Sequence, residues 1–332
     1  MKVLIIRFSS IGDIVMTTPV IRCLQRQTSA IVHVVTKASF ATVYQDNPYI
    51  SKLHLFDDSW DQLVKELRSE KFDHVIDLHN NLRSIKLCIA LGKRAPRLNK
   101  LSLRKALLIY TGINTLPDLH VSERGMKTLR QWSVEKDGKG MDYFVSQNAQ
   151  ESVKLTPGSY ACLALGTAHA TKNMPLDLMK SIIKASPIPL VLLGGPSEKK
   201  AGAILSEEFP EKTKNLAGKI SLDESAAFLE KSHFLIAGDT GILHMAAALK
   251  RPTISIWGAT IPEYGVFPYY GKIGVPYFIQ QVKLPCRPCS KHGSNTCPKG
   301  HFNCMNLQDL SSIILNMNEL NALPYKSYQE LS

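Results

Sequence analysis

The sequence predicts an α/β protein with two doubly wound parallel sheets, one in each half of the chain. Short apolar runs alternate with amphipathic stretches in both halves, which is the pattern of strand–helix–strand units. The length of 332 residues suggests about two domains. Hydrophobic residues make up 44% and charged residues 20%, a globular composition that excludes a disordered or fibrous chain.

In the first half, β-branched and apolar runs predict strands, and the stretches between them have helical spacing. Strands are expected at residues 3–6, 31–35, 53–56 and 74–78, and helices at 14–24 and 60–67. The second half repeats this pattern. Strands are expected there at residues 160–165, 190–193, 234–237 and 253–257, and helices at 176–185, 222–229 and 242–249.

A polar, glycine-containing stretch at residues 136–158 separates the two halves. We therefore predict domains at residues 1–150 and 151–310, followed by a C-terminal helix and tail at residues 311–332. No apolar stretch reaches the ~18 residues that a transmembrane helix needs. The N-terminal segment is charged too early for a secretory signal, so we expect a cytoplasmic protein.

The chain is basic, with 40 Lys and Arg against 28 Asp and Glu and a net charge of +12. Such a charge favours anionic partners: nucleic acid, anionic lipid or phosphorylated substrates. Improved solubility alone is the alternative. Part of the excess lies in one basic run that contains no acidic residue within 23 positions. Its members are Arg83, Lys86, Lys93, Arg94, Arg97, Lys100, Arg104 and Lys105.

Ligands of doubly wound sheets bind beyond the carboxyl ends of the strands, so the loops after strands are where chemistry is expected. Residues 8–13 form the first such loop, and Asp13 lies in the first turn of the helix that follows. An aspartate there either complements the helix dipole or acts as a general base. The loop lacks G-x-G-x-x-G, and no Walker A pattern occurs, which disfavours a nicotinamide oxidoreductase.

Three loops of the second half carry polar residues of phosphate- and ribose-binding type. Residues 238–244 combine Asp239, Thr240 and Gly241 with His244 at the start of a helix, where backbone N–H groups form an anion site. Residues 165–172 offer hydroxyls, a histidine and a lysine to a phosphate. Residues 194–198 end on Glu198, which either binds ribose hydroxyls or belongs to a plain turn.

At these loops together the chain resembles glycosyltransferase family 9, the ADP-heptose:lipopolysaccharide heptosyltransferases. The matching segments are RFSSIGD at residues 7–13, HVSER at 120–124 and GDTGILHMAAAL at 238–249, with a cysteine-bearing tail that ends at 304. The resemblance spans roughly residues 1–310. It implies a GT-B fold of two Rossmann-like domains that face each other across a cleft, with the C-terminal helix often returning to the first domain. The implied reaction is inverting, metal-independent heptosyl transfer.

The resemblance also implies roles for individual residues. The N-terminal domain would bind the acceptor and the C-terminal domain the nucleotide sugar, with Asp13 as the base that takes the acceptor proton. Donor contacts are expected from Thr167, Lys172, Glu198, the backbone near Ile220, Asp239, Thr240, Gly241 and His244. Acceptor contacts are expected from Ser10, Gly12, Arg83, Arg94, Arg97, His120 and Arg124. One departure is Ala168, where the family pattern has a second hydroxyl residue; Thr171 is the candidate replacement.

The acceptor implied by the resemblance is the inner core of lipopolysaccharide, which is anionic and lies at a membrane. The basic run and its interspersed Leu and Ile residues therefore predict peripheral docking on the inner face of the inner membrane. A solvated pair of helices is the alternative interpretation.

The seven cysteines fall into two groups. Cys23, Cys88 and Cys162 lie in apolar runs and are expected to be buried thiols. The second group, Cys286, Cys289, Cys297 and Cys304, has His292 and His301 nearby. Its first pair has zinc-knuckle spacing, so a structural zinc, packed thiols or a disulfide are all open, and no catalytic part is assigned.

Two other functions compete with ADP-heptose transfer to lipopolysaccharide. The first is a family 9 transferase with another sugar nucleotide or another acceptor. The second is a nucleic-acid-binding protein that uses the basic run and a zinc knuckle. That function leaves the strand-end loops without a role, and the basic run lacks interleaved aromatic residues, so we expect no nucleic-acid partner.

Overall fold

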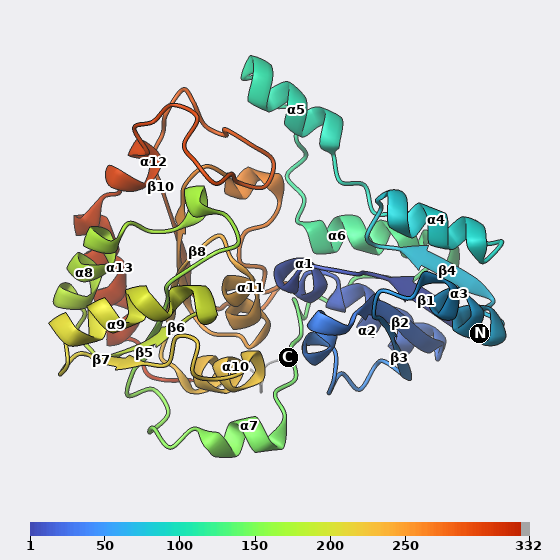
Figure 1. The fold of residues 1–332 in the computed structure, drawn as a ribbon, viewed down its shortest axis with the longest axis horizontal. Coiled ribbons are helices and arrows are strands. Elements are labelled where there is room, and N and C mark those ends of the chain that lie inside the picture. Colours follow the sequence, from blue (N-terminus) through green and yellow to red (C-terminus); the bar gives the residue numbers. More distant parts are fainter. Residues whose placement is uncertain (327–332) are drawn as a thin grey trace. The chain divides into compact units, whose positions relative to one another are not determined.

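The computed structural model describes residues 1–326 and divides the chain into two compact units (Figure 1). The first unit contains Met1–Lys100 and Leu119–Phe144, and the second contains Leu101–Asp118 and the chain from Val145 onward. Residues 101–118 therefore cluster with the second unit, whereas the sequence placed them within the N-terminal domain. The reason is packing, because Leu108 joins Ile261 and Tyr264 in a small apolar cluster of the second unit.

The first unit is built on a four-stranded parallel sheet with the order β3-β2-β1-β4. Its strands are β1 (Lys2–Ile6), β2 (Ile31–Lys37), β3 (Lys52–Phe56) and β4 (His74–Asp77). Its helices are α1 (Ile11–Val15), α2 (Thr18–Thr28), α3 (Trp60–Ser69), α4 (Leu82–Ala90) and α6 (Val121–Met126), with 3-10 turns η1 (Ala38–Val43) and η2 (Lys127–Trp132). The single helix expected at residues 14–24 is two helices, because Pro19 lacks an N–H and is accommodated in the first turn of α2.

One core cluster of the first unit lies between its sheet and α3. Leu4, Val35 and Phe72 are buried there beside Leu63 and Leu67 of α3. Leu63 and Leu67 are four residues apart, so they share one face of the helix. This packing fixes the strands whose carboxyl ends carry the predicted acceptor-side loop.

The second unit contains a six-stranded parallel sheet with the order β10-β9-β8-β5-β6-β7. Its strands are β5 (Ala161–Ala164), β6 (Leu190–Leu193), β7 (Thr213–Asn215), β8 (Leu235–Gly238), β9 (Thr253–Trp257) and β10 (Tyr277–Gln281). Its helices are α5 (Ser102–Thr111), α7 (Gln147–Ser152), α8 (Leu176–Ala185), α9 (Lys199–Glu208), α10 (Leu222–Lys231), α11 (Gly241–Ala248), α12 (Asn303–Asn306) and α13 (Leu310–Ala322). The 3-10 turns are η3 (Ala170–Lys172), η4 (Pro196–Glu198) and η5 (Pro262–Tyr264).

The C-terminal helix α13 packs within the second unit. Ile313, Met317 and Leu320 are buried in the same core cluster as the strand residues Leu163 and Ile254. These contacts hold residues 310–322 on the second unit, whereas the family resemblance led us to expect a return to the first domain. The part of the predicted tail at residues 327–332 lies outside the described residues. Across residues 1–326, no helix is both long and apolar enough to cross a bilayer.

Candidate active site

Asp13 lies in α1, immediately after the loop that follows β1. Its Oδ1 is 2.7 Å from Nη2 of Arg7, and its Oδ2 accepts a hydrogen bond of 2.8 Å from the hydroxyl of Ser10. Arg7 is buried and donates through Nη1 to the carbonyl of Leu78 at 2.6 Å. The Asp13 side chain is 42% exposed. Arg7 and Ser10 therefore fix the orientation of this carboxylate, which is partly open to solvent.

Two further titratable side chains, His79 and Lys100, lie at the carboxyl end of the same sheet; the sequence analysis did not mention His79 and placed Lys100 only in the basic run. Burial lowers the pKa of His79 to about 3, helped by the charge of Arg7. Burial also lowers the pKa of Lys100, again with a contribution from Arg7. Arg7 directly precedes the first loop, at the end of a strand. This position was the one sequence signal that a charged group lies beside Asp13.

The residues predicted to touch the acceptor lie in different surroundings. Arg83 is exposed and stacks over the rings of Phe8 and Phe56, with its Cζ 6.0 and 5.5 Å from their centroids. Arg94 is exposed, and Nε of Arg97 lies 3.8 Å from a buried carboxylate oxygen of Asp77.

His120 and Arg124 are buried rather than presented to solvent. The imidazole of His120 accepts a hydrogen bond from the backbone N–H of Ser122 and so caps α6. Arg124 donates to the carbonyl of Asn99 at 3.1 Å. What the structure shows for both side chains is a role in building the first unit, and their contact with an acceptor stays a prediction.

In the second unit, Lys172 and Asp239 form a buried ion pair. Lys172 Nζ is 2.6 Å from Asp239 Oδ2, and the two side chains are 15% and 9% exposed. The hydroxyl of Thr260 donates to the same oxygen at 2.7 Å. Burial opposes ionisation of Asp239, but the charge and hydrogen bond of Lys172, the charge of His244 and the Thr260 hydroxyl keep its pKa below the ordinary value. The pair brings together loops that the sequence separates by 67 positions.

The N-terminus of α11 follows Asp239 directly. Thr240 is its N-cap residue with extended backbone, and Gly241 is its first residue. The first backbone N–H groups of a helix have no carbonyl partner within it and attract anions. His244 lies one turn further and is 3% exposed. Gly238 has no room for a side chain, because a Cβ there would lie 2.8 Å from the carbonyl of Lys172.

Glu198 ends the loop that follows β6, and its side chain lies against Gly166 in the loop that follows β5. Its Oε2 accepts a hydrogen bond of 2.7 Å from the N–H of Gly195, and its Oε1 accepts one of 2.7 Å from the Ser197 hydroxyl. A Cβ at Gly166 or Gly194 would collide with the Glu198 side chain, at 2.4 and 2.7 Å respectively. The glycines therefore make room for this carboxylate at the strand ends.

Thr167 and Ile220 occupy the same edge of the sheet. The Thr167 hydroxyl donates to the carbonyl of His169 at 2.8 Å, and its N–H donates to the side chain of Asn173. These bonds shape the loop that ends at Lys172. Ile220 is half-buried and precedes Ser221, the N-cap residue of α10.

Residues 286–304, which we call the cysteine segment, were singled out in the sequence for their thiols, but their hydrogen bonds to these loops were not predicted. Thr171 Oγ1 accepts from the N–H of Ser294 at 2.8 Å and donates to its carbonyl at 3.0 Å. The guanidinium of Arg287 donates to the carbonyls of Gly258 and Thr260 at 2.6 and 2.9 Å. Thr171, proposed from the sequence as a phosphate contact, is buried, and its hydroxyl is hydrogen-bonded to Ser294 of this segment instead.

A family model described as glycosyltransferase family 9 (heptosyltransferase) matches residues 60–297. The chain belongs to this family. Lipopolysaccharide heptosyltransferase 1 of Campylobacter coli is 25% identical over 298 residues, which cover 80% of this chain and 85% of that protein.

Solved structures of the family have the same fold. A family 9 glycosyl transferase from Veillonella parvula superposes with a TM-score of 0.77 at 17% identity and covers 96% of this chain and 97% of its own. E. coli heptosyltransferase WaaC with ADP-2-deoxy-2-fluoro heptose has a TM-score of 0.71 at 22% identity, with coverage of 96% and 99%. The predicted GT-B fold class is confirmed, and this family 9 protein is an enzyme, a glycosyltransferase.

The cysteines of this family 9 enzyme are all free thiols. Cys23, Cys88 and Cys162 are buried, as predicted. In the cysteine segment, burial and the neighbouring thiols raise the pKa of Cys289 to about 11. Among residues 1–326, no three of its Cys and His side chains bring their ligand atoms within 4.8 Å of one another. Cys286, Cys297 and Cys304 nevertheless lie near enough to Cys289 for their charges to act on its pKa, and the structural zinc that their spacing suggested stays a prediction.

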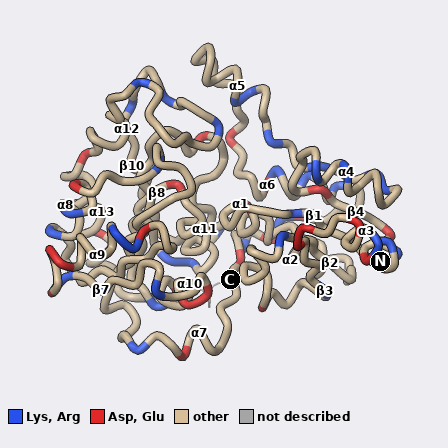
Figure 2. Tube along the Cα trace, in the orientation of Figure 1, with Lys and Arg blue, Asp and Glu red and all other residues tan. Residues whose placement is uncertain are grey.

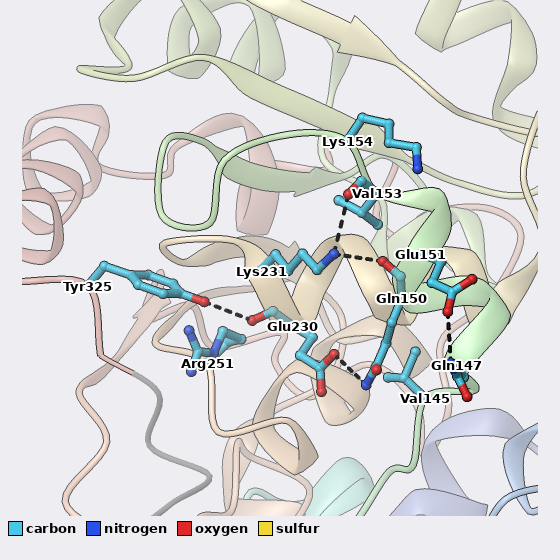
Figure 3. Close-up of a pocket in the computed structure, with 10 residues that line it drawn as sticks. All are labelled: Val145, Gln147, Gln150, Glu151, Val153, Lys154, Glu230, Lys231, Arg251 and Tyr325. Carbon is cyan, nitrogen blue, oxygen red and sulfur yellow. Dashed lines mark hydrogen bonds between the residues drawn. The ribbon is translucent and has the colours of Figure 1, made fainter.

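A wide hollow of about 1130 Å³ opens elsewhere on the second unit of the transferase (Figure 3). It is lined by residues of α7 and α10 and by Arg251 and Tyr325. Lys231 already donates to the carbonyl of Gln150 at 2.6 Å, and Gln150 donates to Glu230. No residue predicted to bind a substrate lines it, so we do not assign it to the reaction.

Proposed function

We propose that this glycosyltransferase moves a heptose from ADP-heptose to the inner core of lipopolysaccharide, with inversion at the anomeric carbon. The observation that carries the proposal is the Lys172–Asp239 pair beside the N-terminus of α11. It places an ammonium group and the first amides of a helix at the carboxyl ends of the strands. Such groups stabilise the negative charge of a departing diphosphate. The heptosyltransferase relatives supply the sugar and the acceptor.

In the donor half of the reaction, the bond between the anomeric carbon and the diphosphate oxygen breaks, and ADP leaves with the bonding electrons. Lys172 and the first amides of α11, at Gly241, stabilise the negative charge that grows on the diphosphate. Asp239 orients Lys172 and faces the sugar, while His244 lies beside the diphosphate. Glu198 takes the ribose hydroxyls, Thr167 shapes the phosphate loop, and the backbone near Ile220 faces the adenine.

In the acceptor half, a sugar hydroxyl of the lipopolysaccharide core attacks the anomeric carbon as the diphosphate departs. Asp13 accepts the hydroxyl proton through its exposed carboxylate, which Arg7 and Ser10 hold in place. A new carbon–oxygen bond forms, and the proton ends on Asp13. The first unit thus binds the acceptor, with Gly12, Arg83, Arg94 and Arg97 on its side, and the second unit binds the donor.

Calorimetric titration with ADP, GDP and UDP in EDTA tests the donor assignment. We expect micromolar binding of ADP and at least tenfold weaker binding of GDP and UDP, because the proposed donor is an adenine nucleotide. ADP should bind in EDTA because side chains and backbone amides of the protein contact the diphosphate. Preference for GDP or UDP would keep the family and overturn ADP-heptose. Absence of all nucleotide binding, combined with salt-sensitive DNA binding, would favour the nucleic-acid function.

We also propose that the enzyme docks on the anionic inner face of the inner membrane. Figure 2 shows Lys and Arg along α4 and at the start of α5. On α5, Leu103 and Tyr110 are 88% and 86% exposed, although Leu108 of the same helix is buried. Exposed apolar side chains next to Arg104 give this helix the amphipathic character of an interfacial segment.

Vesicle sedimentation checks the docking proposal. The triple variant Leu103→Ser, Arg104→Glu, Tyr110→Ser should lower binding to vesicles rich in anionic lipid by roughly tenfold or more, with ADP affinity unchanged. The control is Lys65→Glu with Leu315→Ser, which combines one charge reversal and one apolar-to-serine change at exposed positions of α3 and α13. Equal vesicle binding by both variants and the wild type would sink the docking proposal.

A further inference from the structure

A group of side chains of metal-ligand type lies in the first unit, away from every residue assigned to a substrate. His33 is on β2 and His54 on β3, two positions apart in the register of these strands, so both point to one face of the sheet. Helix α3 covers that face and brings Glu66 and Glu70 to the two imidazoles. His33 and His54 are 4% and 1% exposed, so the pair is enclosed.

The ligand atoms of three of these residues converge. Nδ1 of His33 is 2.9 Å from Nε2 of His54 and 3.9 Å from Oε2 of Glu70, and all three atoms lie within 4.8 Å of one another. In residues 1–326 this is the sole group of three Cys, His, Asp or Glu side chains that meets this distance. An ion placed among them would reach each atom with small side-chain movements.

The hydrogen bonds around His54 leave the correct nitrogen for a metal. Oε1 of Glu66 lies 2.5 Å from Nδ1 of His54 and accepts its proton. The lone pair of Nε2 then faces His33 and Glu70, which is the carboxylate–histidine arrangement that orients metal-binding imidazoles. Two imidazoles joined by one hydrogen bond share a single proton between their nitrogens. A metal ion would replace that proton and bind both lone pairs.

Two lysines accompany Glu70 and leave it able to bind an ion. Lys2 and Lys52 each lie 2.6 Å from one of its carboxylate oxygens. Each carboxylate oxygen has a second lone pair, so an ammonium group and a metal ion can share it. The lysine side chains are 29% and 46% exposed and can turn into water when a cation binds.

We propose that His33, His54 and Glu70 bind one divalent transition-metal ion, with Zn²⁺ as the natural occupant of a two-histidine, one-carboxylate site. His33 lies in the amino-terminal half of β2, His54 is the middle residue of β3, and Glu70 follows the C-terminus of α3. The Asp13 loop follows the carboxyl end of β1 instead. The ion therefore ties β2, β3 and α3 together and takes no part in the transfer.

Cobalt titration of the full-length, reduced and EDTA-treated protein tests this site. Co²⁺ bound by histidine and carboxylate gives visible d–d bands alone, whereas cysteine thiolates add a strong near-ultraviolet charge-transfer band. We expect one equivalent of Co²⁺ with d–d bands and no charge transfer. Glu70→Gln and His54→Gln should each lose that equivalent, and Cys286→Ser should keep it. In the wild type, Zn²⁺ should compete with Co²⁺ and raise the melting temperature; in Glu70→Gln it should not.

Only variants that fold like the wild type are compared. Circular dichroism in EDTA checks the fold of the metal-free protein, and ADP affinity checks the second unit. Glu70→Gln changes a half-buried side chain and keeps the test decisive even where His54→Gln fails to fold. The proposal is overturned by d–d bands that come with thiolate charge transfer and vanish in Cys286→Ser, by absence of stoichiometric Co²⁺ binding, or by d–d bands that persist in Glu70→Gln.

Discussion

Asp13→Asn should reduce the turnover of heptosyl transfer by roughly 10²–10⁴-fold, the range typical of a lost general base. Asparagine keeps the shape of the side chain and an oxygen for the Ser10 hydroxyl, but it cannot accept the acceptor proton. ADP affinity should stay unchanged, because every predicted donor contact belongs to the second unit. Steady-state kinetics with a lipopolysaccharide-core acceptor, alongside calorimetry with ADP, checks both expectations.

The control for this variant must separate base catalysis from the electrostatics of a helix N-terminus. Asp61 lies in the first turn of α3, as Asp13 lies in the first turn of α1, and it is exposed. Asp61→Asn removes the same favourable interaction with a helix dipole and should leave turnover unchanged. Ser10→Ala removes one hydrogen bond to Asp13 and should produce a smaller loss than Asp13→Asn. Undiminished turnover of Asp13→Asn would refute the base assignment.

Lys172→Met should lower turnover by roughly 10²–10³-fold, because it removes a charge that stabilises the departing diphosphate. It should also destabilise the fold by about 3–5 kcal/mol, because Asp239 is then a buried carboxylate without its cation. Denaturant unfolding measures the stability, and single-turnover kinetics with ADP-heptose measures the chemical step. The two losses have different causes and can be separated.

The double variant Lys172→Met, Asp239→Asn separates them. A neutral amide at residue 239 can still accept the hydrogen bond of Thr260, so most of the lost stability should return. Turnover should remain low, because the ammonium group is still missing. Lys180→Met is the matched control, since it breaks an exposed ion pair with Glu208 and should change neither quantity by much. Recovery of turnover in the double variant would contradict the role of Lys172.

Much of the fold follows from local patterns in the sequence. The strands at residues 190–193 and 253–257 and the helix at 176–185 begin and end where they were predicted. Each is an unmixed apolar or amphipathic run whose period identifies it. The strand β10 escaped prediction because YFIQQ is an edge strand without a buried face, with its residues half-buried or exposed.

In the candidate site, local sequence patterns predict which residues follow strands but not which distant residues contact one another. Asp13, Lys172 and Asp239 each follow a strand, so their placement at sheet edges could be predicted from position in the chain. The contact of Thr171 with Ser294 joins residues 123 positions apart, and no periodicity encodes such a pairing. The meeting of His33 and His54 depends in the same way on strand register, which the sequence does not state locally.

The hydrogen bonds between the donor loops and the cysteine segment set an order of events during synthesis. A nascent chain that has emerged as far as residue 285 already contains Lys172, Asp239 and every other residue expected to touch the nucleotide. It still lacks Arg287 and Ser294, which hold the loops after β5 and β9. Nucleotide competence should therefore arise late on the ribosome, once the chain beyond residue 285 has been made.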